Sequence, residues 1–90
     1  MRELTFPTIH LNGSSADDLI KQNRNAVYKI QEAMEALRKA APHGRDYYMQ
    51  YDGAFAYART EHENRMTKLK EVFDELHEIV MDLYRQQPEK

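Results

Sequence analysis

The sequence predicts an all-α protein: an antiparallel two-helix hairpin with an extended N-terminal arm, which assembles as a homo-oligomeric helical bundle. Two long segments repeat apolar residues at steps of three and four, and Pro42 and Gly44 interrupt the chain between them. With 90 residues, of which 41% are apolar and 31% charged, the chain has the size and composition of one domain. We therefore expect a single domain over residues 1–90.

An extended arm is predicted for residues 1–13, because apolar and polar residues alternate on both sides of Pro7. Proline confines such a segment to a sheet edge or to an irregular arm. The sequence offers no second strand to pair with it. The arm should therefore lie along the helices or reach another subunit.

The first helix is predicted over residues 14–41. Two overlapping Ser-x-x-Asp pairs, which begin at Ser14 and Ser15, have the spacing of a capping box, and Pro42 ends the helix. One face of it is apolar except for Asn23, and an Asn in such a seam usually fixes register or oligomeric state. The seam comprises Ala16, Ile20, Asn23, Val27, Ile30, Met34, Leu37 and Ala41.

The second helix is predicted over residues 54–86, with Asp46 or Asp52 as a possible cap. Its seam has His62 as the polar exception. Antiparallel pairing across the loop should bring together residues whose numbers sum to about 95, so His62 should meet Met34. The seam comprises Phe55, Ala58, His62, Met66, Leu69, Phe73, Leu76, Val80 and Leu83.

Further apolar residues flank both seams and predict self-association. Tyr28, Val72 and Ile79 add more apolar surface than one hairpin can cover. The first expected partner is therefore a second copy of the chain. Lys21 and Arg24 lie off the seam, where they are either solvated or share one face with a bound anion.

Composition excludes several function classes. The chain has no cysteine, no apolar run long enough for a membrane span and no signal-peptide pattern, so we expect a cytoplasmic protein without membrane contact. Its net charge of -2 argues against binding to duplex nucleic acid. Asp74 and His77 form only a weak metal-ligand pair, and no nucleophile or nucleotide-binding motif is present. We expect no enzyme activity, no cofactor and no metal.

The predicted loop, residues 42–53, and the helix after it concentrate rings, cations and imidazoles. These groups suit a nucleotide-like anionic ligand, with stacking for a base and charged hydrogen bonds for a phosphate. They also suit a polar subunit interface, or tyrosines that cap the hairpin beside cations that complement a helix dipole. The expected ligand-binding residues are His43, Arg45, Tyr47, Tyr48, Tyr57, Arg59, His62 and Arg65.

Three short motifs carry a resemblance. Residues 9–13 (Ile-His-Leu-Asn-Gly), residues 42–48 (Pro-His-Gly-Arg-Asp-Tyr-Tyr) and the Glu61-His62 pair with Arg65 resemble a group of short proteins encoded by tailed phages and prophages. The resemblance implies a bacterial host cytoplasm during infection. In that setting, small helical-hairpin oligomers sequester nucleotide signals of host defence, and this chain is similar to them in size and style.

The sequence therefore predicts one function and leaves one alternative. The first is sequestration of a nucleotide-like anion without catalysis. The alternative is a structural or regulatory protein that binds a host or virion protein through the helical hairpin.

Overall fold

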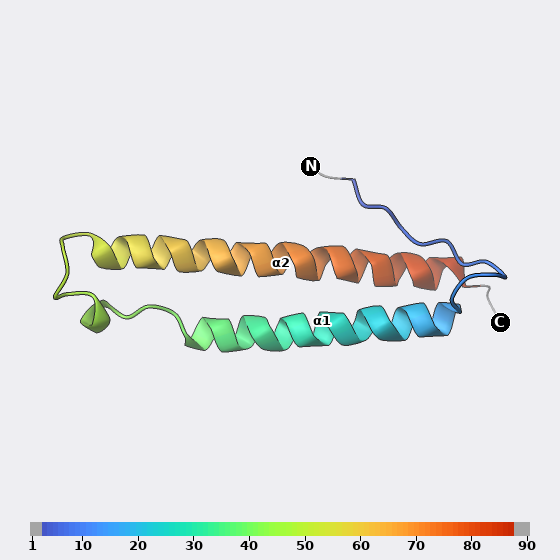
Figure 1. The fold of residues 1–90 in the computed structure, drawn as a ribbon, viewed down its shortest axis with the longest axis horizontal. Coiled ribbons are helices and arrows are strands. Elements are labelled where there is room, and N and C mark those ends of the chain that lie inside the picture. Colours follow the sequence, from blue (N-terminus) through green and yellow to red (C-terminus); the bar gives the residue numbers. More distant parts are fainter. Residues whose placement is uncertain (1–2, 88–90) are drawn as a thin grey trace.

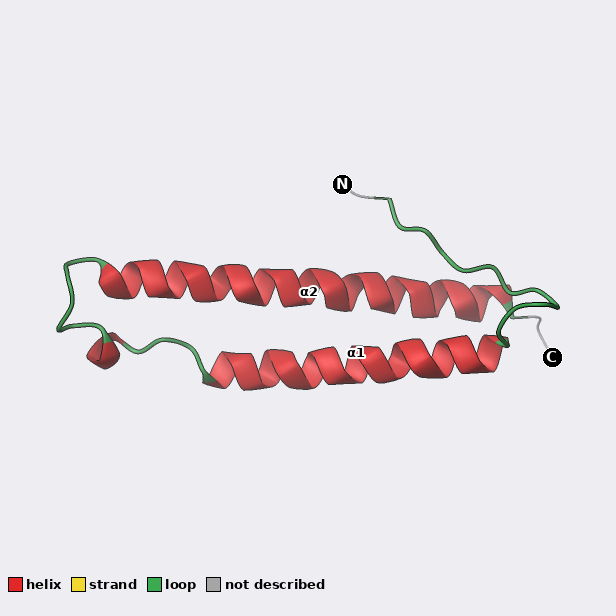
Figure 2. Ribbon diagram, viewed as in Figure 1, coloured by secondary structure: helices red, strands yellow, loops and turns green. Residues whose placement is uncertain are grey.

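The structure, a computed structural model that describes residues 3–87, is a hairpin of two long helices packed side by side (Figure 1). Helix α1 spans Ala16–Lys39 and helix α2 spans Ala54–Gln86, with a short 3-10 helix, η1, at Gly44–Asp46 between them. The described residues contain no strand (Figure 2). The predicted all-α hairpin is confirmed, and the molecule is elongated, 61 × 25 × 20 Å.

Helix α1 is two residues shorter at each end than predicted. Ser15, not Ser14, is the N-cap, and its hydroxyl oxygen accepts a hydrogen bond from the Asp18 amide at 3.1 Å. At the other end, the Ala40 amide donates to the carbonyls of the last turn and closes the helix before Ala41.

Helix α2 has the predicted bounds but not a predicted cap. Gly53 occupies the N-cap position with φ 91°, and no side chain caps the helix there. Glycine reaches this left-handed conformation without steric cost. Neither Asp46 nor Asp52 is the N-cap, because the chain enters α2 through this glycine turn.

The two predicted seams form the core. Every seam residue is buried or half-buried, and Leu83 is fully enclosed. His62 is the only buried polar residue between residues 3 and 87. Asn23 donates from its side-chain amide to the Leu19 carbonyl at 2.9 Å, so its hydrogen bond lies within α1 and does not reach α2.

The expected register does not hold. Gln87 donates to Asp17 at 3.3 Å and Arg24 donates to Tyr84 at 3.1 Å, so facing residues sum to between 104 and 108 and not to about 95. In this register His62 lies opposite the chain that follows α1, not opposite Met34. The register differs from the prediction because the chain reverses later in the sequence than expected, at the far end of the predicted loop.

The segment after α1 continues alongside the first turns of α2 before the chain turns back. Tyr47 lies 6.3 Å from Phe55 between ring centroids. The reversal is completed at Gly53, at the far end of the predicted loop. Helix α2 therefore extends beyond α1, and η1 lies beside the extension (Figure 1).

The N-terminal arm lies against the C-terminal end of α2 in the same chain, which is one of its two expected positions (Figure 1). The Gln86 side chain accepts a hydrogen bond from the Ile9 amide at 2.9 Å and donates to the Pro7 carbonyl at 2.8 Å. It also donates to Asp82 at 2.8 Å, which holds the amide group in place. One glutamine thus binds the arm as a neighbouring strand would.

Neither helix has a stretch long and apolar enough to cross a membrane, within the part of the chain that the structure describes.

Candidate functional site

The tip of the hairpin, residues 42–59, carries most of the predicted ligand-binding residues. His43 precedes η1 with an extended backbone and Arg45 lies within η1, and both side chains are exposed. Tyr47 follows η1 and is half-buried against Phe55. Helix η1 therefore positions Arg45, and Tyr47 directly after it.

A small cluster joins the tip to α2. The Arg59 guanidinium lies 5.6 Å from the centre of the Phe55 ring, in a cation-π arrangement, and Tyr47 approaches the same ring. Phe55 was expected only in the core seam. The structure therefore brings together two of the predicted residues through a third that was not among them.

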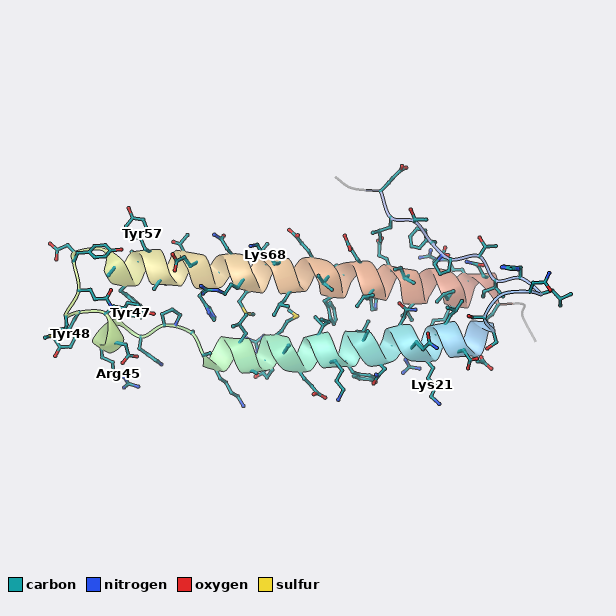
Figure 3. The ribbon with its side chains drawn as sticks, in the orientation of Figure 1. Lys21, Arg45, Tyr47, Tyr48, Tyr57 and Lys68 are labelled. Carbon is teal, nitrogen blue, oxygen red and sulfur yellow. The ribbon has the colours of Figure 1, made fainter. Side chains whose placement is uncertain are left out.

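The other tip residues diverge. Tyr57 points away from α1 on the outer side of α2, Tyr48 points beyond the end of the hairpin, and Arg45 points outward from η1 (Figure 3). Tyr57 has Tyr51 beside it, with ring centroids 6.4 Å apart. These side chains lie around a projecting end and do not converge on one point.

His62 and Arg65 occupy different environments. His62 is 8% exposed within the seam, which leaves little of its imidazole to a ligand. Arg65 is exposed on the surface of α2. The predicted set Arg59, His62 and Arg65 is therefore not one continuous binding face.

The exposed large apolar side chains of the tip, three tyrosines and one methionine, are its strongest physical feature. The exposed fractions are 76% for Tyr48, 83% for Met49, 65% for Tyr51 and 65% for Tyr57. Large apolar side chains at such exposure, grouped at one end of a molecule, are typical of an interaction site.

A groove lies at the other end of the hairpin, between α1 and the last turns of α2. Its cavity has a volume of about 690 Å³ and is lined by residues of both helices. A second cavity of about 400 Å³ continues along the same side and shares Arg24, Tyr28 and Tyr84 with the first. We call these three residues and Lys21 the Arg24 groove.

Arg24 is held at the centre of this groove. It donates to the Tyr84 hydroxyl at 3.1 Å, across 60 residues of sequence. Hydrogen bonding by the Tyr28 phenol and the nearby Tyr84 raise the pKa of Arg24 above its usual value. An arginine guanidinium is charged in any case. The spacing of Lys21 and Arg24 indicated this shared face, whereas no sequence pattern pointed to Tyr84.

The described residues contain no group of three or more His, Asp or Glu side chains that could hold a metal ion. The nearest sequence candidate, His77, instead stacks on Phe73, with ring centroids 6.2 Å apart and planes 10° apart. His77 lines the second cavity of the groove.

Comparison of the chain with protein-family models, with curated proteins and with solved structures gives no match.

Proposed function

We propose that the protein is a non-catalytic interaction protein that self-associates into a helical bundle and binds a protein partner through its tip. The exposure of Tyr48, Met49, Tyr51 and Tyr57 carries the proposal. A small-molecule site is usually concave, whereas these side chains project from one end. Tyrosines of this kind supply much of the binding energy in protein interfaces.

The accessible surface supports self-association. The chain exposes 7580 Å², whereas a compact monomer of 10.7 kDa exposes about 5,500 Å². The excess, roughly 2,000 Å², exceeds the ~800 Å² that each partner contributes to a standard interface. One contact with a second copy would bring the exposed area much closer to that of a stable monomer.

A second apolar stripe provides the surface for this contact. Leu19, Ala26 and Ala33 recur every seven residues on α1, and Val72 and Ile79 do so on α2. Helical periodicity places both rows on the side of the hairpin opposite to the Arg24 groove. Two hairpins that pack these rows together would form a four-helix bundle.

Affinity capture from bacterial lysate tests the tip. The native protein should retain a stoichiometric protein partner, and the double variant Tyr48→Ala/Tyr51→Ala should lose it while keeping its oligomeric mass. Lys68→Ala, on the exposed surface of α2 away from the tip (Figure 3), is the matched control and should retain the partner. Equal capture by the tip variant would contradict the proposal.

The second candidate function is sequestration of a nucleotide-like anion at the tip. The arrangement of Tyr47, Phe55 and Arg59 favours it, because a cation lies beside two rings. Tyr47→Ala and Arg59→Ala should then release a small molecule that co-purifies with the native oligomer, as native mass spectrometry would show. Retention of that molecule by both variants would exclude this site.

The motif resemblance supports a bacterial setting for either function. A phage or prophage protein would meet its partner, whether a host protein, a virion protein or a nucleotide signal, in the host cytoplasm.

A further inference from the structure

We infer that the Arg24 groove is a binding site for a small ring-bearing phosphate monoester, of the nucleoside monophosphate class. The site lies at the opposite end of the hairpin from the tip (Figure 1) and does not depend on the proposed partner there. Its volume, about 690 Å³, lies within the range of ~300–1,000 Å³ that is typical of ligand sites.

Two cations of the groove have no carboxylate partner among residues 3–87. The ion pairs among residues 3–87 join Lys29 to Glu32, Arg38 to Glu35, Lys70 to Asp74 and Arg85 to Asp82. None of them includes Lys21 or Arg24, although both line the cavity. Lys21 and Arg24 lie three residues apart on α1, so together they make the electrostatic potential of the groove positive and favour an anion there.

The one acidic residue of the cavity lies at its end. Asp17 accepts a hydrogen bond from Gln87 at 3.3 Å, so its carboxylate already has a partner. Counting Asp17, Lys21 and Arg24, the lining carries a net charge of +1. This charge fits a small anion with a single phosphate better than a polyanion.

Arg24 is oriented before any ligand arrives. Its bond to the Tyr84 hydroxyl ties the guanidinium to α2, and the phenols of Tyr84 and Tyr28 together engage at most two of its five N–H donors. The remaining donors are available for two parallel bonds to phosphate oxygens. Holding a long side chain in place in advance reduces the entropy that binding costs.

The rings and side-chain amides of the groove suit a flat, polar base attached to the phosphate. Tyr28 and Tyr84 line both cavities with partly exposed rings, on which a flat base can stack. Gln22 and Asn25 of α1 also line the first cavity and carry amide donors and acceptors. Lys21 lies at the outer rim, where its side chain points away from α2 (Figure 3).

Calorimetric titration of the full-length protein with AMP tests the site. Adenosine and inorganic phosphate are titrated separately, and each should bind at least about tenfold more weakly than AMP, because each engages only half of the groove. Arg24→Gln should weaken AMP binding by about tenfold or more, as expected for loss of a charged, paired contact. Tyr84→Phe keeps the ring, removes the hydroxyl and should weaken AMP binding less.

Arg38→Gln is the matched control, since Arg38 is on the same helix but pairs with Glu35 outside the groove. It should leave AMP binding unchanged. If Arg24→Gln loses helicity by circular dichroism, Lys21→Gln replaces it, because Lys21 is exposed at the rim.

Three results would overturn the inference. The native protein binds no AMP, or AMP binding survives in the Arg24 and Lys21 variants, or phosphate alone binds as tightly as AMP. AMP binding that is lost in Arg59→Ala but kept in Arg24→Gln would place the ligand at the tip instead. A change of oligomeric mass in Arg24→Gln without AMP binding would make the groove a contact between copies.

Discussion

Replacement of Gln86 by alanine should release the N-terminal arm from α2. The Gln86 amide makes two hydrogen bonds to the arm backbone, one with the Ile9 amide at 2.9 Å and one with the Pro7 carbonyl at 2.8 Å. Such bonds contribute about 0.5–1.5 kcal/mol each, so Gln86→Ala should cost about 1–3 kcal/mol of docking free energy. The ratio of docked to released arm should fall by roughly 5- to 150-fold.

Amide hydrogen exchange at Ile9, followed by NMR, measures this ratio directly. The Ile9 amide donates to Gln86 itself, so Gln86→Ala removes both its acceptor and part of the docking free energy, and protection should fall by at least this factor. Gln87→Ala is the control, because Gln87 bonds to Asp17 and not to the arm. Equal Ile9 protection in the native protein and in Gln86→Ala would refute the idea that this glutamine holds the arm.

Three further substitutions test the fold by chemical denaturation. Leu83→Ala should lower the free energy of unfolding by about 2–5 kcal/mol, because Leu83 is fully buried; a loss below 1 kcal/mol would contradict the packing. Ser15→Ala should lower the free energy of unfolding by about 1 kcal/mol through loss of its cap bond, and Ser14→Ala by less than about 0.5 kcal/mol. A larger loss for Ser14→Ala than for Ser15→Ala would show that Ser14 is the N-cap. Gly53→Ala should cost about 1 kcal/mol or more, because its φ of 91° is a conformation that alanine rarely adopts. Gly44→Ala should be close to neutral, because the added methyl group would meet the Phe55 ring at an ordinary contact distance of 3.9 Å. Equal effects would argue against the glycine turn.

The helices and their core faces are predictable from the sequence because burial repeats with the helical period. A pattern such as Leu76, Val80 and Leu83 has no other way to enter one core. The choice of Ser15 over Ser14 as N-cap could not be predicted from the sequence. Both have an aspartate at the right spacing, and only the backbone path into the helix decides between them.

Register was not predictable, because periodic seams can pair at several offsets with little change in burial. The prediction placed the reversal in the middle of the loop. The chain instead packs Tyr47 against Phe55 and reverses at Gly53, a choice made by ring contacts and one backbone angle. Moving the facing residues by about ten positions shifts one helix along the other by roughly 15 Å.

Each candidate site was also predictable only in part. The sequence pointed to the residue types of the tip, but not to the directions in which Arg45, Tyr48 and Tyr57 point, since loop geometry sets these. For the Arg24 groove, the spacing of Lys21 and Arg24 indicated that these two residues share one face of α1. The sequence did not indicate Tyr84, which is 60 residues from Arg24 and contacts it only in the folded hairpin.

The unequal lengths of the two helices divide the hairpin into parts that can open separately. In the observed register the last residue of α1, Lys39, faces residues 65–69 of α2, so at least the first 11 residues of α2, about 16 Å, have no partner in α1. The first turns of α2 therefore pack against η1 and the residues around it, through the contact of Tyr47 with Phe55, and not against the seam that encloses Leu83. We therefore expect this end to open as a local unit while the rest of the hairpin stays folded.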